Sequence, residues 1–254
     1  MWEVELNGKQ HPNVVNKIGS IAQWYLKAAQ YWENTEATTN GVLGGFGILH
    51  EPDIHDSNEF LDFLNKNFGL QYGRVIDCGA GTGRITKELL LKHFQTVDVV
   101  DQNPKYIEHM AQEFNSNPQV QLYITSGLQS LNFTELYDCI WIQWVSNYLT
   151  DDDFINFLTR CKNALKKNVN LKTCLFTLLY FCKQFYIKGI IIVKENIANS
   201  GFVVDKEDNS VTRSEQLFLE LFNQVQLVLV ADQLQSNFPK ELFKVKSYAL
   251  MSQY

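Results

Sequence analysis

Hydrophobic periodicity divides the chain into two parts. Apolar residues recur at helical spacing over residues 14–28 and again over 60–64, which predicts that residues 1–65 are helical. From about residue 73, short apolar runs alternate with amphipathic segments, a pattern typical of βαβ units around a mainly parallel sheet. We therefore predict an α/β fold in which a helical N-terminal lid, residues 1–65, precedes a sheet domain, residues 66–254.

Seven apolar runs in the second part have the length and composition of buried strands. We predict strands near residues 73–78, 96–101, 119–125, 137–143, 189–194, 225–231 and 243–251, with helices between most of them. The clearest helix follows Thr150, which can cap it while Asp153 closes a capping box. Thr212 and Glu215 predict a second box of this kind. The result is a seven-stranded sheet flanked by helices.

Composition and charge narrow the function classes. The 254 residues are 45% hydrophobic and 20% charged, as in an ordinary soluble enzyme core. A formal net charge of −6 argues against a nucleic-acid partner and suits a cationic substrate. Five cysteines without a C-x-x-C pair indicate neither a disulfide framework nor a metal site. The first residues lack the layout of a signal peptide, so we expect a cytoplasmic or nuclear location.

A glycine-rich turn gives the first indication of a ligand. The strand predicted at 73–78 runs through Asp77 into the G-x-G-x-G turn at 79–83 and then into a helix. Glycines without Cβ atoms let the backbone approach a ligand at a helix N-terminus. A nicotinamide site is expected to show G-x-G-x-x-G, so this spacing favours S-adenosylmethionine. Asp101, at the end of the next strand, can accept hydrogen bonds from both ribose hydroxyls, whereas Asp98 is expected to be structural.

Several nearby positions have a structural as well as a functional interpretation. Trp141 and Trp144 lie at a predicted strand end and can both be core residues, Trp141 more readily than Trp144. Gln143 lies between them at the carboxyl edge, where open α/β sheets bind ligands. The charged run 205–208 can be an ordinary solvated loop, and composition alone favours that interpretation.

Nine short segments share the pattern of one known family. They are residues 23–25, 31–32, 41–47, 77–91, 97–101, 127–129, 141–144, 193–196 and 205–213. Together they resemble the protein α-N-terminal methyltransferases, a branch of the Rossmann-like class I methyltransferases. The resemblance implies methyl transfer from S-adenosyl-L-methionine to the α-amine of proteins that begin X-Pro-Lys or X-Pro-Arg. Segments 141–144 and 205–213 are the most specific to this branch.

The resemblance also implies roles for individual residues. The residues that would bind the cofactor are Gly79, Gly81, Arg84, Asp101, Gln102, Leu128 and Gln143, with Arg84 near the methionine carboxylate. The residues that would line the substrate channel are Trp32, Trp144, Asn196, Asp205, Asp208 and Ser210. Asn196 and Asp208 would orient the amine, and Asp208, with a water or Tyr148, would accept its proton. Ribosomal or chromatin-associated proteins are the partners implied, with no membrane or nucleic acid involved, and a monomer or weak dimer is expected.

The sequence departs from the family pattern in two ways. Tyr148 stands where a histidine is usual, and a phenol with a pKa near 10 is a poor base, so we expect it to orient rather than deprotonate. Glu195 for aspartate and Phe243 for tyrosine are milder changes. Residues 169–188 have no family counterpart and are too interrupted by charge to span a bilayer. Because a valine codon begins with GT and lysine can be AAG, we interpret this insertion as a translated intron.

Two alternative functions remain open at this point, and a nicotinamide dehydrogenase is a third. A methyltransferase for a small molecule would share the cofactor half of the chain but not the peptide channel. A catalytically inactive homologue that still binds the cofactor would explain Tyr148 and the insertion.

Overall fold

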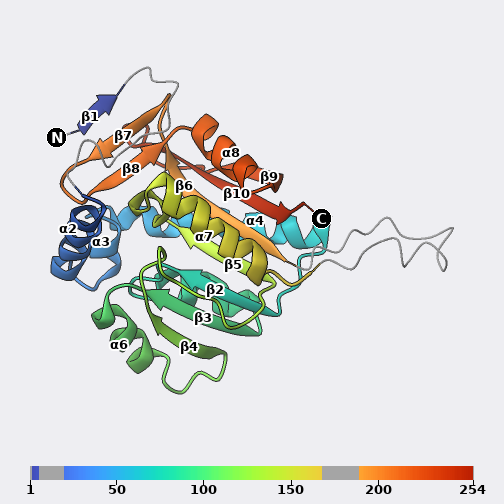
Figure 1. The fold of residues 1–254 in the computed structure, drawn as a ribbon. Helices are drawn as coiled ribbons and strands as arrows, with labels where there is room; N and C mark the ends of the chain where they lie inside the picture. The colour runs from blue at the N-terminus through green and yellow to red at the C-terminus, as the bar shows by residue number, and fades with distance from the viewer. Residues whose placement is uncertain (1, 6–19, 168–188, 254) are drawn as a thin grey trace.

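A seven-stranded sheet forms the centre of the computed structural model, which describes residues 2–5, 20–167 and 189–253 (Figure 1). In spatial order its strands are β4 (Val120–Thr125), β3 (Thr96–Asp101), β2 (Arg74–Cys78), β5 (Cys139–Gln143), β6 (Ile190–Ile197), β10 (Lys244–Ser252) and β9 (Leu227–Leu234). Strand β10 is antiparallel to both neighbours, and the other pairs are parallel. The predicted fold class and all seven predicted strands are confirmed.

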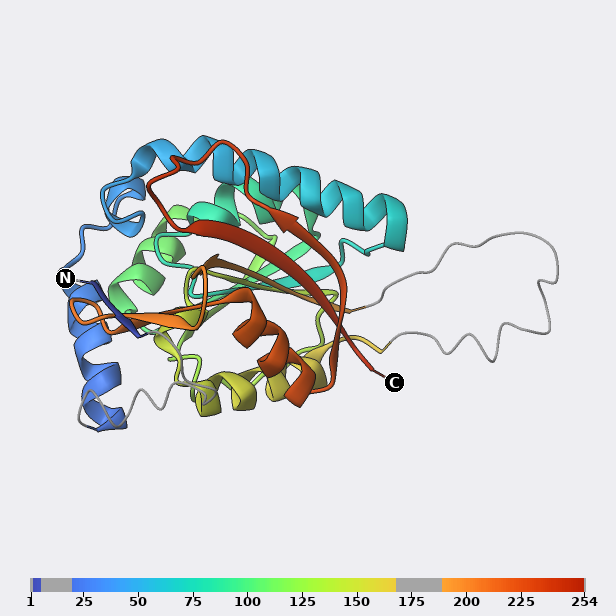
Figure 2. The ribbon, with the colours of Figure 1, turned by 90° about the horizontal axis from the view of Figure 1, so that it is seen from above.

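Helices cover both faces of this sheet because successive strand residues point to opposite sides. On one face, α7 (Asp151–Ala164) and α8 (Glu215–Gln224) pack against residues such as Ile140 and Ile142. On the other face, α4 (His50–Phe68) and α6 (Pro104–Glu113) pack against residues such as Cys139 and Trp141. Figure 2 shows α4 and the pair α7 and α8 on opposite sides of the sheet. Trp141 is therefore a core residue, in agreement with the structural interpretation of this position.

A second, three-stranded sheet was not predicted. Its strands are β1 (Trp2–Glu5), β7 (Phe202–Asp205) and β8 (Ser210–Arg213), all antiparallel. The prediction that residues 1–65 are helical is therefore wrong at β1, where apolar and acidic residues alternate with the period of a strand. Residues 6–19 lie outside the described residues. The remaining N-terminal helices are α2 (Ile21–Asn34), α3 (Thr39–Val42) and the long α4, which packs on the sheet.

The two predicted capping boxes are only partly correct. Thr150 does cap α7, because its hydroxyl accepts the Asp153 backbone N–H at 3.2 Å. The Asp153 carboxylate, however, accepts the Tyr25 hydroxyl of α2 at 2.5 Å, and the Thr150 N–H donates to that hydroxyl at 3.3 Å. The second box is wrong, since Ser214 caps α8 and Thr212 belongs to β8. In the first box a tertiary neighbour, Tyr25, accepts the Thr150 N–H in place of Asp153. In the second box the predicted cap residue, Thr212, belongs to a strand.

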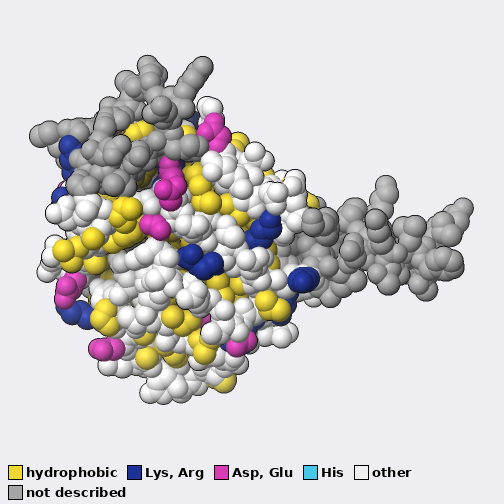
Figure 3. All heavy atoms as spheres, in the orientation of Figure 1, with side chains coloured by type: hydrophobic (Ala, Val, Ile, Leu, Met, Phe, Trp, Pro, Cys, Tyr) yellow, Lys and Arg dark blue, Asp and Glu magenta, His cyan; other side chains and the backbone are white. Residues whose placement is uncertain are grey.

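The surface of the face seen in Figure 3 carries dispersed charge. Among the described residues on this face, Lys and Arg side chains lie apart from one another between apolar and acidic ones. Over the described parts of the chain, no helix combines the length and apolarity needed to cross a membrane.

The predicted insertion, residues 169–188, falls outside the described residues, but both of its flanks are described. Leu165 pairs with Tyr137, and the Lys166 N–H donates to the Tyr137 carbonyl at 2.9 Å. On the other side the Ile190 N–H donates to the Asp138 carbonyl at 3.0 Å. A Cβ atom on Gly189 would lie 2.7 Å from the Lys166 carbonyl oxygen. The two flanks thus lie side by side at the start of β5.

Deleting residues 169–188 is therefore expected to leave the fold intact. The remaining link between Lys166 and Gly189 has only a short gap to close, and shortening a loop costs little. Thermal unfolding should show a Tm within about 4 °C of the full chain, which corresponds to roughly 1 kcal/mol. A longer deletion, 169–191, removes the start of β6 and should unfold the protein. Loss of folding in the shorter variant would show that the segment is structurally required, and sequencing the transcript would decide whether it is a retained intron.

Candidate active site

The glycine turn after β2 opens the backbone toward a cleft. Gly79 and Gly81 have φ values of 75° and 57°, in the left-handed region that favours glycine. A Cβ on Gly79 would lie 2.5 Å from a methyl carbon of Val145, so no larger residue fits there. The Gly81 N–H donates to the Asp101 carboxylate at 2.9 Å, and the Asn103 N–H donates to it at 2.8 Å. The Asp101 carboxylate and the glycine backbone of the turn therefore both face the cleft.

The cleft has a volume of about 970 Å³, including space open to solvent. It forms where parallel neighbouring strands end together, which is where open α/β sheets bind ligands. Its lining includes every residue predicted for the cofactor: Gly79, Gly81, Arg84, Asp101, Gln102, Leu128 and Gln143. It also includes Trp32, Trp144 and Tyr148, but not Asn196, Asp205, Asp208 or Ser210. Sequence reasoning had not selected Tyr25, Ala28, Val42, Tyr106 or Leu149, which contribute mainly apolar wall.

One wall of the cleft is organised by an acid that sequence reasoning missed. Asp53 of α4 is fully buried, and its carboxylate accepts the Arg84 guanidinium at 2.7 Å and the Gln143 amide at 2.8 and 2.9 Å. The Trp141 indole N–H donates to the Gln143 carbonyl at 3.0 Å, which orients that amide. No motif spacing marks Asp53, because it is 31 residues from Arg84 in sequence and 90 from Gln143.

Trp144 has an unusual backbone at the edge of this wall. Its φ of 51° is rare for a bulky residue, and its N–H donates to the Lys194 carbonyl at 3.1 Å. The Arg84 guanidinium lies 5.5 Å from the Trp144 ring centroid, and Phe238 stacks on the indole at 6.4 Å. The buried indole N–H has no hydrogen-bond partner in the described parts of the protein. Strain of this kind is typical of functional sites.

Tyr148 and Asp208 form a hydrogen-bonded pair next to the cleft. Tyr148 ends the short 3₁₀ turn Ser146–Tyr148, its ring meets Trp32 edge-on at 5.9 Å, and its hydroxyl donates to Asp208 Oδ2 at 2.9 Å. Burial raises the pKa of Tyr148 well above its ordinary value, so the phenol stays protonated. Burial also raises the pKa of Asp208, against smaller lowering effects of Ser210 and Tyr148. The second oxygen, Asp208 Oδ1, is buried and accepts no hydrogen bond from the described residues.

Glu195 joins the turn that carries Tyr148 to the end of β6. Its buried carboxylate accepts the Ser146 hydroxyl at 2.9 Å and the Asn196 backbone N–H at 3.1 Å. Burial raises its pKa to about 7. A single carboxylate thus joins Ser146, which begins the turn that carries Tyr148, to the backbone of Asn196.

The raised pKa makes Glu195 a source of pH-dependent stability. Its carboxyl binds a proton more strongly in the folded than in the unfolded protein, so the stability it contributes is present below about pH 4.5 and is lost as the pH rises through about 7. Relative to Glu195→Gln, the native protein should lose on the order of 1–3 kcal/mol of unfolding free energy between pH 5 and 7.5. Urea unfolding at both pH values measures this. Glu195→Asp keeps a carboxyl and should keep the dependence, whereas parallel curves for native protein and Glu195→Gln would contradict the assignment.

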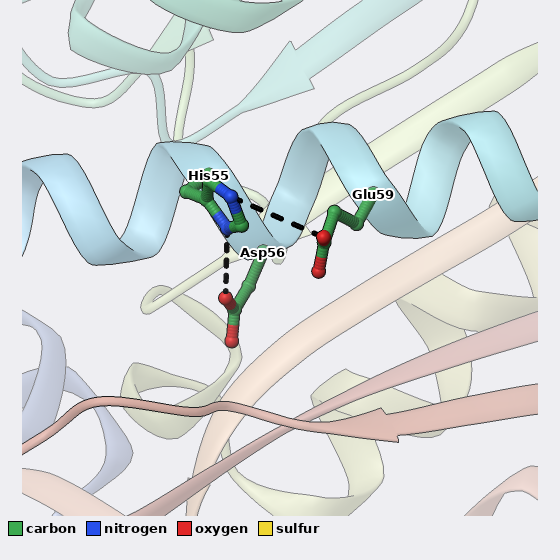
Figure 4. Close-up of side chains that lie close together, drawn as sticks. All are labelled: His55, Asp56 and Glu59. Atoms are coloured by element: carbon green, nitrogen blue, oxygen red, sulfur yellow. Dashed lines mark hydrogen bonds and ion pairs between the residues drawn. The ribbon is translucent and has the colours of Figure 1, made fainter.

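A cluster of possible metal ligands, His55, Asp56 and Glu59, lies on α4 and does not line the cleft (Figure 4). His55 Nδ1 is 3.4 Å from an Asp56 oxygen, and His55 Nε2 is 3.9 Å from Glu59. The buried Asp56 carboxylate already accepts the Ser236 N–H at 2.5 Å and the Gln235 amide at 2.8 Å. We therefore assign Asp56 a structural role, which ties α4 to the chain after β9.

Comparisons with known proteins decide the family. A model of the family described as AdoMet-dependent proline di-methyltransferases matches residues 20–174 and 173–251. The chain is 38% identical over 256 residues to alpha N-terminal protein methyltransferase 1 of Dictyostelium discoideum, covering 98% of this chain and 85% of that protein. The chain belongs to this methyltransferase family. The methyltransferase is also 36% identical over 232 residues to N-terminal Xaa-Pro-Lys N-methyltransferase 1-B of Xenopus laevis, covering 90% and 95% of the two chains.

A solved structure supports the same conclusion. An S-adenosylmethionine-dependent methyltransferase from Leishmania major superposes with a TM-score of 0.77 at 36% identity, covering 89% of this chain and 82% of that one. The predicted family, enzyme class and cofactor are thereby confirmed. The two matched segments of the family meet at residues 173–174, inside the predicted insertion. The cleft also fits the cofactor, because a glycine cradle, the Asp101 carboxylate and the Arg84 guanidinium all face it.

Proposed function

We propose that this methyltransferase modifies the α-amino group of proteins that begin X-Pro-Lys or X-Pro-Arg. The Xenopus laevis relative carries the Xaa-Pro-Lys specificity in its name, and the similarity extends over nearly the whole of both chains. The structural observation that carries the proposal is Asp208 Oδ1, a buried carboxylate oxygen without a hydrogen bond from the described residues, beside the aromatic wall of the cofactor cleft. Such an oxygen is suited to receive a proton from an amine.

The cofactor residues divide by chemistry. Asp101 is placed to accept the ribose hydroxyls, and Gly79 and Gly81 let the backbone approach the cofactor. Arg84 is assigned to the methionine carboxylate, while Gln102, Leu128 and Gln143 complete the lining. When bound, S-adenosylmethionine supplies an electrophilic methyl group on its sulfonium.

The substrate residues extend from the cleft to β7 and β8. Trp32 and Trp144 present ring faces and edges on which a proline can pack. Asp205 ends β7 and Asp208 lies in the loop that leads to Ser210 of β8, so the two carboxylates can attract a basic third residue. Burial raises the pKa of Tyr31, and the charges of Asp208, Glu207 and Asp205 raise it further, which supports a common acidic region beside Tyr31.

The reaction needs only a weak base. An α-amine has a pKa of about 7.7–8.0, so it loses its proton readily near neutral pH. Asp208 would accept that proton on Oδ1, while Tyr148 holds Oδ2 and keeps its own proton. Asn196, at the end of β6, would orient the amine together with Asp208. Ribosomal and chromatin-associated proteins with such N-termini, in the cytoplasm or nucleus, are the substrates to which the proposal points.

Mass spectrometry of a short Ser-Pro-Lys peptide tests the proposal directly. After incubation with enzyme and S-adenosylmethionine, the free peptide should gain mass in steps of one methyl group, and an N-acetylated control should gain none. No gain while S-adenosylhomocysteine still binds would overturn the substrate assignment and favour a small-molecule methyltransferase or an inactive homologue.

A further inference from the structure

Lys194 is a buried lysine just outside the cofactor cleft. It lies in β6 with 1% of its surface exposed, and its ammonium is 2.6 Å from Asp53 Oδ1. The same ammonium donates to the Ser57 hydroxyl at 2.8 Å and to the Asp53 backbone carbonyl at 3.1 Å. An ammonium has three N–H donors, and these three acceptors use all of them. Lys194 is therefore directed at Asp53 and not at a ligand.

The Asp53 carboxylate consequently faces two cations at once. Oδ1 meets Lys194 and Oδ2 meets Arg84, so this carboxylate is in direct contact with two positively charged groups. Asp56 also attracts Lys194 electrostatically, without an ion pair to it. Although burial by itself raises the pKa of Asp53, the charges of Lys194 and Arg84 outweigh it and lower the pKa. Asp77, another carboxylate near Arg84, accepts its hydrogen bond from the Thr86 hydroxyl at 2.7 Å. No single carboxylate is thus committed to Arg84 alone.

The sharing of Asp53 affects the cofactor site because, of these two cations, Arg84 lines the cleft and Lys194 does not. Arg84 lines the cleft beside Trp144, whereas Lys194 lies behind Asp53 on the buried side. If Lys194 were neutral, Asp53 and Arg84 would form a closed, mutually neutralising pair, as buried ion pairs do when their geometry is good. With Lys194 charged, Arg84 keeps positive charge that an anionic group in the cleft can neutralise.

We propose that Lys194 is a positioning residue of the cofactor site. Its ammonium balances the negative charge of Asp53 from the side away from the cleft, so the positive charge of Arg84 stays available to the carboxylate of the cofactor. The inference rests on the proposed assignment of Arg84 to that carboxylate. It adds a buried residue that does not line the cleft to the determinants of cofactor affinity.

Two ligands that differ in the carboxylate separate this role from a merely structural one. S-adenosylhomocysteine carries the amino-acid group, and 5′-methylthioadenosine keeps the adenosine and sulfur but lacks it. By calorimetry, Lys194→Met should bind S-adenosylhomocysteine about tenfold or more weakly, but bind 5′-methylthioadenosine within about twofold of the native protein. Lys246→Met is the matched control, because Lys246 of the adjacent strand β10 also forms ion pairs, with Glu215 and Asp232, away from the cleft. It should leave both affinities unchanged.

A double variant tests the charge argument even if Lys194→Met folds poorly. Asp53→Asn with Lys194→Met removes the negative charge that would otherwise close on Arg84, so affinity for S-adenosylhomocysteine should return to within about threefold of the native value. Equal weakening of both ligands, or native affinity in Lys194→Met, would overturn the proposal. Failure of the native protein to bind S-adenosylhomocysteine would instead refute the cofactor assignment on which it rests.

Discussion

Replacing Asp208 by asparagine is expected to lower kcat for methylation of an X-Pro-Lys peptide by about 10²–10⁴-fold. Asparagine keeps the shape and can still accept the Tyr148 hydroxyl, but it cannot take up a proton from the amine. Burial, which raises the pKa of Asp208, brings this carboxyl closer to the working pH of a general base. Because Asp208 does not line the cofactor cleft, the affinity for S-adenosylhomocysteine should stay close to native.

Two further variants distinguish proton transfer from electrostatic attraction. Asp205→Asn, at the end of β7, removes a neighbouring negative charge and should raise KM for the peptide several-fold with little change in kcat. Tyr148→Phe keeps the ring against Trp32 but removes the hydrogen bond to Asp208, so we expect a smaller loss of kcat than in Asp208→Asn. If Asp208→Asn kept native kcat, another group or a water would have to serve as the proton acceptor.

Replacing Asp101 by asparagine is expected to weaken binding of S-adenosylhomocysteine by about 10–100-fold. Hydrogen bonds to a charged acceptor are roughly twice as strong as neutral ones, and two ribose hydroxyls would lose this advantage together. Asp101 also orders the glycine turn through the Gly81 and Asn103 N–H groups, which asparagine can accept only in part. Calorimetric titration measures the effect without any turnover.

Asp98 offers a matched control on the same strand. It is fully buried three residues earlier in β3, where it pairs with Arg74 at 2.8 Å and accepts the Tyr137 hydroxyl at 3.0 Å. Asp98→Asn should therefore lower the unfolding free energy while leaving the affinity for S-adenosylhomocysteine near native. A comparable loss of affinity in both variants would mean that Asp101 acts through the stability of β3 and not through the ribose.

The sequence alone determined the parts of this protein whose physics is local. Seven strands, their mainly parallel arrangement and the class of cofactor followed from short apolar runs, from a G-x-G-x-G turn and from an acid at the next strand end. Gly79 and Asp101 were identifiable because a tight turn and a strand end impose their chemistry on neighbouring positions. The predicted cofactor residues accordingly all line one cleft.

Tertiary structure alone decided how charges are shared around that cleft. Asp53, Lys194 and Glu195 come from α4 and β6, and no spacing in the chain links them to Arg84, Gln143 or Tyr148. The strand β1 likewise exists through its partner β7. The Asp153 carboxylate accepts the hydroxyls of Tyr25 and Thr150, while the Thr150 backbone N–H donates to Tyr25 and not to Asp153. The physical reason is common to these cases. The stability of a buried charge or an edge strand depends on its partner in space, and the partner is supplied by packing, not by sequence neighbours.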